Sequence, residues 1–224
     1  MPLLNQKTAE QVRKELTGLT SPVRLVVFTQ EFECTYCKEN RQLAEEIAEL
    51  SELVEIEVYD FVADKDKAEE LNIDKIPATA VIGSEDYGIR FYGIPAGYEF
   101  TSLLQAIKTL GTGELPFEEE MIGFLKSIDR PVHLQVFVTP TCPYCPQSVV
   151  LAHQMAVASP MVRADMVETT EFPHLSQRYQ VMGVPRTVIN ETEYVEGAAP
   201  ADMILDKIKS LLASAEAVTE DMVR

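Results

Sequence analysis

The sequence contains one cysteine–proline pattern twice, at a constant offset. Its four cysteines form two C-x-x-C pairs, Cys34–Cys37 and Cys142–Cys145. In each half a proline, Pro77 or Pro185, follows the second cysteine by 40 residues, so an offset of 108 positions relates the halves. A C-x-x-C pair beside a strand–helix pattern indicates redox chemistry. The sequence therefore predicts two copies of one disulfide-exchanging unit.

The repeat extends beyond the cysteines and prolines. Without gaps, ten residues from position 34 onward are identical to the residues 108 positions later. They are Cys34, Tyr36, Cys37, Leu43, Ala44, Ala48, Ser51, Val54, Pro77 and Thr79. A Gly- and Pro-rich run at 111–116 separates the two copies. We therefore predict a duplicated chain with domains over residues 1–113 and 114–224.

Hydrophobic periodicity predicts the same order of elements in both halves. In the first half we expect strands at 23–29, 54–59, 78–82 and 89–92, and helices at 10–16, after the cysteine pair to about 50, at 64–71 and at 98–110. In the second half we expect strands at 132–138, 163–167, 187–189 and 194–195, and helices at 118–128, after the cysteine pair, at 172–179 and at 202–212. Alternating apolar strands and helices predict an α/β fold in which each half has its own central mixed sheet, flanked by helices on both faces.

Composition limits the partners and the compartment. A formal net charge of −17 argues against nucleic acid or a membrane surface as partner, since neither would find a basic patch. Residues 1–19 contain no apolar signal-peptide core, and no apolar stretch approaches 18 residues. We therefore expect a cytoplasmic protein without a bound cofactor. In that compartment cysteines serve catalysis or metal binding more often than structural disulfides.

The cysteine spacing suggests a role for each thiol. A thiolate attacks a disulfide, and a helix N-terminus favours the thiolate through its free N–H groups and dipole. We expect Cys34 and Cys142 to lie at such positions and to act as nucleophiles. The i, i+3 spacing would bring Cys37 and Cys145 onto the same helix face as resolving thiols.

Local charge separates the two predicted sites. Glu31 and Glu33 raise the expected pKa of the Cys34 thiol, and Lys38 offsets this in part. The residues before Cys142 are neutral, and Arg186 beside the second proline would favour its thiolate. We therefore expect the second site to be the stronger nucleophile.

Four further residues occupy matching places in the two halves. Tyr36 and Tyr144 lie between the cysteines, where they either contact substrate or shield the sulfur atoms. Asp60 and Glu168 end matching strands, where they are either candidates for proton transfer or simply solvated. The three histidines are scattered, and none pairs with a cysteine in sequence.

Two other interpretations of the cysteines stay open. A Cys₄ zinc site would make the chain a metal-stabilised structural protein, but zinc knuckles are usually about 15–20 residues apart. Here 104 residues lie between Cys37 and Cys142, and no histidine accompanies either pair. Alternatively the first pair is vestigial, given its neighbouring glutamates.

These residues resemble a known superfamily. The strand–CxxC–helix unit followed by Ile/Val-Pro-x-Thr resembles the thioredoxin-like proteins, and Cys142-Pro143-Tyr144-Cys145 matches the glutaredoxin active-site sequence. Two such units in one chain resemble the glutaredoxin-like protein disulfide oxidoreductases of thermophilic archaea and bacteria. The resemblance covers residues 5–213.

The resemblance implies two thioredoxin folds that reduce, oxidise or isomerise protein disulfides. It also implies cis peptide bonds at Pro77 and Pro185, with Ile76 and Val184 offering their backbone to the substrate. The implied partners are protein disulfides and a thioredoxin-reductase-like electron donor. A reductase that passes electrons to a peroxidase is the nearest alternative.

Overall fold

A computed structural model describes residues 2–222 of the chain. Its strands are β1 (Val23–Thr29), β2 (Val54–Asp60), β3 (Ala78–Ile82), β4 (Ile89–Tyr92), β5 (Val132–Val138), β6 (Val162–Glu168), β7 (Arg186–Ile189) and β8 (Glu193–Glu196). Its helices are α1 (Gln6–Leu16), α2 (Cys37–Ala48), α3 (Lys65–Glu70), α4 (Glu99–Thr112), α5 (Glu119–Ser127), α6 (Cys145–Ala158), α7 (Pro173–Arg178) and α8 (Ala201–Met222). Every predicted element is present, and only α1 and α8 are clearly longer than expected.

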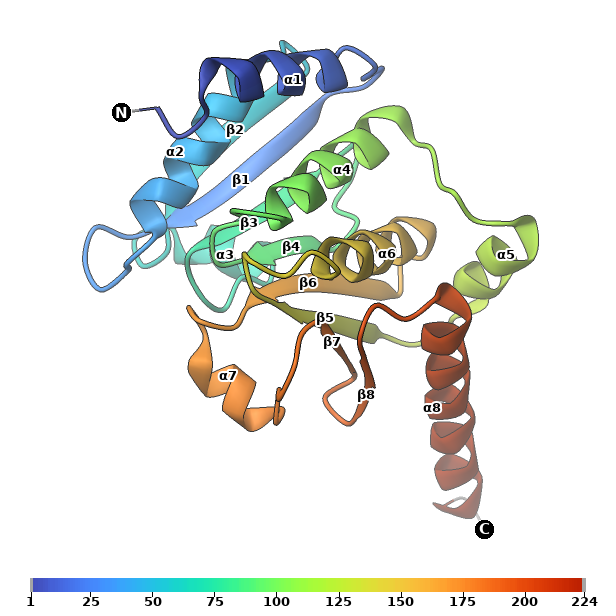
Figure 1. Ribbon diagram of the computed structural model, residues 1–224. Coiled ribbons are helices and arrows are strands. Elements are labelled where there is room, and N and C mark those ends of the chain that lie inside the picture. Colours follow the sequence, from blue (N-terminus) through green and yellow to red (C-terminus); the bar gives the residue numbers. More distant parts are fainter. Residues whose placement is uncertain (1, 223–224) are drawn as a thin grey trace.

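The eight strands form one continuous sheet in the order β2-β1-β3-β4-β6-β5-β7-β8 (Figure 1). Each half contributes the mixed four-stranded sheet that the sequence predicts, β1–β4 from the first half and β5–β8 from the second, and the two sheets are joined edge to edge. β4 of the first half pairs in parallel with β6 of the second, from Ile89 opposite Ala164 to Tyr92 opposite Val167. An exposed sheet edge leaves backbone N–H and C=O groups unpaired, and joining the two edges satisfies them. The boundary between residues 113 and 114 stays a prediction.

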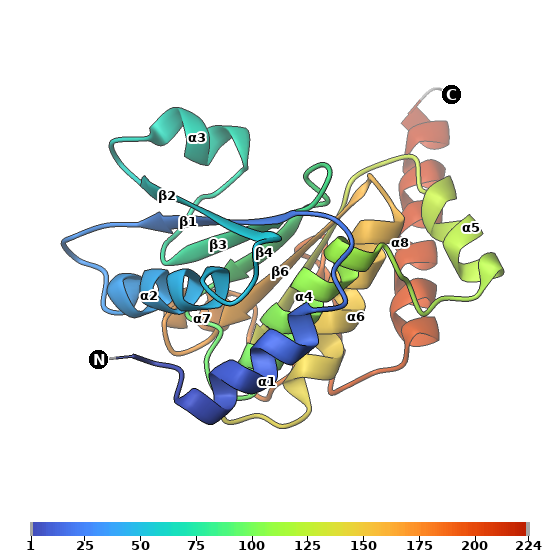
Figure 2. The ribbon, with the colours of Figure 1, turned by 90° about the horizontal axis from the view of Figure 1, so that it is seen from above.

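Helices cover both faces of this sheet, as the apolar strands predict. Along β1, Leu25 and Val27 face the larger core, which α1, α2, α4 and α6 cover. Val26 and Phe28 alternate to the opposite face and pack in a smaller core with Ala68 of α3. The separation of α3 from α1, α2, α4 and α6 by the sheet is visible in Figure 2. No helix within residues 2–222 is long and apolar enough to cross a membrane.

Candidate active sites

Sheet topology brings both cysteine pairs to the same edge of the sheet. β1 and β5 run in the same direction, and each is followed directly by a cysteine loop. β3 and β7 run antiparallel to them, so Pro77 and Pro185, which precede these strands, also lie at that edge. β1 and β5 are four steps apart in the sheet, or about 19 Å at about 4.8 Å per step. The molecule therefore has two separate cysteine sites with a common orientation.

Each C-x-x-C pair forms its own disulfide, with a Cα–Cα distance of 5.5 Å in both sites. The helices begin only at the second cysteine of each pair, after Tyr36 and Tyr144 as N-cap residues. The expectation that both sulfurs share one helix face is therefore wrong, because the first cysteine lies in the turn before the helix. The two sulfurs meet across that turn.

The outer and inner cysteines differ in burial. Cys37 and Cys145 are 1% and 0% exposed, since each begins a helix that packs on the sheet. Cys34 is half-buried and Cys142 is 8% exposed. In both sites the outer cysteine is thus the more exposed residue, which agrees with its predicted role as nucleophile.

A cis-proline accompanies each cysteine pair. The Ile76–Pro77 and Val184–Pro185 bonds are both cis, which confirms the geometry that the family resemblance implies. Each cis-proline carbonyl accepts a hydrogen bond from a glycine: Gly93 at 2.9 Å for Pro77 and Gly197 at 2.8 Å for Pro185.

At the second site, the disulfide directly contacts the segment before the cis-proline. The Sγ atom of Cys142 lies 3.8 Å from the carbonyl oxygen of Val184. Val184 and its counterpart Ile76 are half-buried, so part of each residue reaches the surface beside its site. The tyrosines between the cysteines are exposed, Tyr36 by 43% and Tyr144 by 68%.

Two predicted pKa-tuning cations have different surroundings. Lys38 is exposed at the start of α2. Arg186 is buried, and its Nη1 atom lies 2.6 Å from Glu196 while its guanidinium stacks 3.5 Å over the ring of Tyr194. The described side-chain contacts of Arg186 are with β8, so its positive charge is paired with Glu196 and not with Cys142. A tuning role for either cation is still a prediction.

The two strand-end acids hold the turns that follow their strands. Asp60 accepts hydrogen bonds from the N–H groups of Val62 and Ala63 at 2.9 and 2.8 Å. Glu168, only 1% exposed, accepts from the Glu171 N–H at 2.7 Å. Glu168 is therefore not a solvated acid, and its contacts are those of a turn-capping residue. Proton transfer by either acid is a prediction that these contacts do not test.

Among solved structures, a protein disulfide oxidoreductase from Aeropyrum pernix is 30% identical in sequence. The two superpose with a TM-score of 0.87 over 92% of this chain and 93% of that one. The chain belongs to the protein disulfide oxidoreductases. Within it, residues 132–210 match the thioredoxin domain family.

This oxidoreductase also resembles components of alkyl hydroperoxide reductases. The alkyl hydroperoxide reductase component AhpF of Enterococcus faecalis is 25% identical, with a TM-score of 0.85 over 91% of this chain and 98% of the solved one. The corresponding alkyl hydroperoxide reductase component of Staphylococcus epidermidis is 31% identical over 80% of this chain and 32% of its own length. The chain spans about a third of the length of the curated relatives it matches.

The sequence of this oxidoreductase did not single out two further glutamates, the buried Glu99 and the half-buried Glu171. Glu99 is 1% exposed at the start of α4, and burial raises its pKa to about 7, although the Ser102 hydroxyl donates to it at 2.6 Å. Burial also raises the pKa of Glu171 to about 7, and the neighbouring charge of Glu168 adds to this. Glutamates are common in first helical turns and in loops, so the sequence alone could not single these two out.

Proposed function

We propose that the protein exchanges disulfides with protein substrates through two independent dithiol couples. In the reducing direction, the Cys142 thiolate attacks a substrate disulfide and forms a mixed disulfide, releasing one substrate thiol. Cys145 then loses its proton and attacks the Cys142 sulfur, which releases the second substrate thiol. Two electrons pass to the substrate, and the couple ends as the Cys142–Cys145 disulfide. Cys34 and Cys37 act in the same way.

The single observation that supports this proposal most strongly is the arrangement of each bridged pair. A more accessible outer cysteine, Cys34 or Cys142, is bonded to a buried inner one beside a cis-proline. A nucleophile must reach the substrate, whereas a resolving thiol needs only to reach the first sulfur. In the proposed complex the substrate backbone pairs with Ile76 or Val184, and Tyr36 or Tyr144 contacts its side chains.

The alternative of a Cys₄ zinc protein has little support from this geometry. The two pairs belong to strands four steps apart in one sheet, and no group of three or more potential metal ligands occurs among the described residues. One zinc ion would need all four sulfurs within about 2.3 Å of itself.

The proposal includes a cytoplasmic setting and a thioredoxin-reductase-like protein as electron donor. A net charge of −17 gives no basic surface for nucleic acid, so we infer that partners are recognised through the cysteine sites. Whether the couples work as reductants or oxidants depends on their potentials relative to this donor.

Reduction of insulin by dithiothreitol, catalysed by wild type, Cys34→Ser and Cys142→Ser, tests the function. We expect Cys142→Ser to lose most turnover and Cys34→Ser to keep most of it, because glutamates flank only the first site. The reverse pattern would refute the ranking but not the function. No turnover by wild type would refute the oxidoreductase itself.

A second candidate function is electron delivery to a peroxide-reducing partner. The observation in its favour is that AhpF-type components of alkyl hydroperoxide reductases match most of this chain. Peroxide consumption by a separate thiol peroxidase, measured with and without this protein under a limiting reductant, would test it. Acceleration that requires Cys142 would support this function.

A further inference from the structure

A short segment of the first half lies against the cysteine loop of the second. This segment, residues 93–98, links β4 to α4 and is called the strap here. Its last residue, Tyr98, donates its N–H to the carbonyl oxygen of Pro140 at 3.0 Å. Pro140 precedes Cys142 by two residues, so the strap is bonded directly to the loop that carries the outer cysteine of the second site.

The contact between strap and loop is too close for an ordinary side chain. Gly97 has a φ of 61°, a conformation that favours glycine. A Cβ atom at Gly97 would lie 2.2 Å from the Pro140 oxygen, well inside a van der Waals contact. The strap therefore has both the backbone conformation and the absence of a side chain that this approach requires.

The other end of the strap is held by the sheet junction. Ile94 donates its N–H to Glu171 Oε1 at 2.7 Å, and Gly93 donates to the Pro77 carbonyl at 2.9 Å. A Cβ atom at Gly93 would lie 2.6 Å from the Cβ of Glu168. Both ends of the strap are thus anchored, one to the junction of the halves and the other to the second site.

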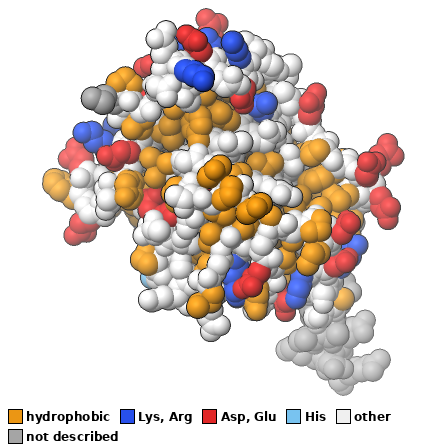
Figure 3. Space-filling model, in the orientation of Figure 1, with side chains coloured by type: hydrophobic (Ala, Val, Ile, Leu, Met, Phe, Trp, Pro, Cys, Tyr) orange, Lys and Arg blue, Asp and Glu red, His pale blue; other side chains and the backbone are white. Residues whose placement is uncertain are grey.

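The strap leaves an aromatic side chain at the surface beside the second site. Tyr98 is 51% exposed although its backbone is fixed to Pro140. A shallow groove of about 460 Å³ lies between α4 and α6, and its walls include Thr101, three residues after Tyr98, and Gln105 of one half and Pro146 of the other. Hydrophobic side chains gather over α4 and α6 on the face shown in Figure 3.

The first site is constructed differently at the matching position. The counterpart of Pro140 in the repeat is Phe32, which is 75% exposed. Its carbonyl accepts a hydrogen bond at 2.8 Å from the side chain of Gln30, within the same loop. The strap contact therefore belongs to the second site.

We propose that the first half completes the substrate-binding surface of the Cys142–Cys145 couple. The strap fixes the cysteine loop, and Tyr98 with the α4–α6 groove binds the protein chain on one side of the substrate disulfide. This inference rests on the proposed function, and the occupant is the same protein substrate. Tyr98 is a specificity residue, since a small disulfide would not extend far enough to touch it.

The experiment uses the full chain with Cys34→Ser and Cys37→Ser, so that only the second couple reacts. Tyr98→Ser in this background should raise the KM for insulin about fivefold, as expected for the loss of one partly exposed aromatic contact. Its kcat and its rate with a small aromatic disulfide should not change. Tyr98→Phe should give the KM of the protein with Tyr98. The matched control is Leu3→Ser, because Leu3 is also an exposed apolar residue but contacts α2.

The same substitution is then made with Cys142→Ser and Cys145→Ser, where only the first couple reacts. Tyr98→Ser should leave the KM of this protein unchanged. An unchanged KM at the second couple, or an equal rise at both couples, would overturn the inference while leaving the proposed function intact. If the second couple reduces neither insulin nor the small disulfide, the proposed function fails as well.

Discussion

Cys34 and Cys142 occupy matching positions in the repeat but have different neighbours. Cys34 follows a loop with two exposed glutamates and an exposed Phe32. Cys142 lies against Val184 and belongs to a loop that the first half holds through Pro140. At the scale of single residues, the duplication has therefore produced two sites with one chemistry and different access.

A buried histidine beneath the junction of the halves makes stability depend on pH. His153 of α6 is 2% exposed, with its ring edge-on to Phe91 at 4.8 Å between centroids. Burial lowers its pKa to about 4, below the ordinary value of 6.5. The unfolded chain therefore binds the proton first, and stability contributed by the neutral ring is lost as pH falls from 6.5 towards 4.

We predict that His153→Phe removes this loss, which reaches at most about 1.4 kcal/mol per pH unit. Urea unfolding of wild type and variant at pH 7, 6 and 5 measures the difference. Glu99 and Glu171 have raised pKa values and therefore add stability as pH falls below 7, which is the opposite trend. Both residues are present in wild type and in the variant, so their contribution cancels in the difference between the two proteins. His174→Phe, an exposed position on α7, is the control and should show no such trend. Parallel pH curves for wild type and His153→Phe would refute the prediction.

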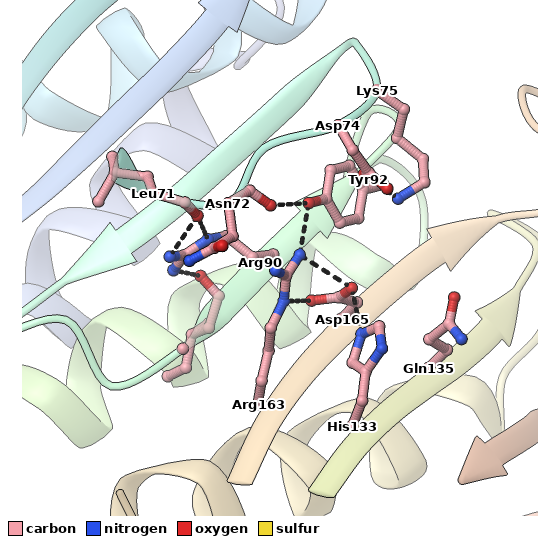
Figure 4. A network of polar contacts seen from close by, with 12 residues as sticks. Leu71, Asn72, Asp74, Lys75, Arg90, Tyr92, His133, Gln135, Arg163 and Asp165 are labelled. Atoms are coloured by element: carbon pink, nitrogen blue, oxygen red, sulfur yellow. Dashed lines mark hydrogen bonds and ion pairs between the residues drawn. The ribbon is translucent and has the colours of Figure 1, made fainter. Parts of the chain in front are cut away.

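At the scale of elements, a network of polar side chains connects β4 and β6 in addition to their backbone hydrogen bonds. Asp165 of β6 is fully buried, 2.6 Å from His133 of β5 and 3.0 Å from Arg163 (Figure 4). Arg163 also donates to the hydroxyl of Tyr92 on β4 at 2.7 Å. The network thus joins strands of both halves.

We predict that Asp165→Asn destabilises the protein by about 3 kcal/mol at pH 7, because it leaves a partly buried guanidinium without its partner. Burial would raise the pKa of Asp165, but His133 and Arg163 hold it at about 2. The carboxylate's contribution is therefore complete above pH 3.8 and is lost as pH falls towards 2. Guanidinium unfolding at pH 7 and pH 3 should show a smaller deficit at the lower pH.

The exposed pair of Asp129 and Arg130 provides the control for this experiment. Its atoms are 2.9 Å apart, but the Asp129 side chain is 69% exposed. Asp129→Asn should change stability by less than about 1 kcal/mol. Equal losses in the two variants would show that burial of Asp165 is not the cause.

At the scale of the whole molecule, one continuous sheet fixes the separation of the two couples. The strands that carry the sites are four steps apart, or about 19 Å. A disulfide requires Cα atoms within about 7 Å. A disulfide between the two couples would therefore require a large movement of one half relative to the other.

We predict that a Cys37→Ser/Cys145→Ser protein, which keeps only Cys34 and Cys142, forms no internal disulfide. Diamide treatment of the dilute monomer, followed by thiol counting and mass spectrometry, measures this. Wild type under the same treatment should form both local disulfides, which checks the oxidant. An internal Cys34–Cys142 bond would mean that the halves separate and close on each other in solution.

Local sequence patterns predicted most of this fold. Continuous apolar runs such as 23–29 predict strands that are buried on both faces, and a core is present on each face of the sheet. The cysteine pairs, the prolines and their common offset identified both candidate sites, because redox chemistry needs two sulfurs at a fixed spacing.

Three features depended on tertiary structure. The pairing of β4 with β6 joined the two predicted sheets into one. Local sequence does not specify this pairing, because any exposed edge strand offers the same unpaired backbone groups. Packing of distant segments also buried Asp165 and half-buried Glu171, and their shifted pKa values follow from desolvation and neighbouring charges that no sequence window contains. It also brought Tyr98 onto Pro140, 42 residues along the chain. The sequence thus determined the elements and the chemistry of each site, while the packing of one half on the other decided how the two sites differ, because that packing depends on contacts between distant residues.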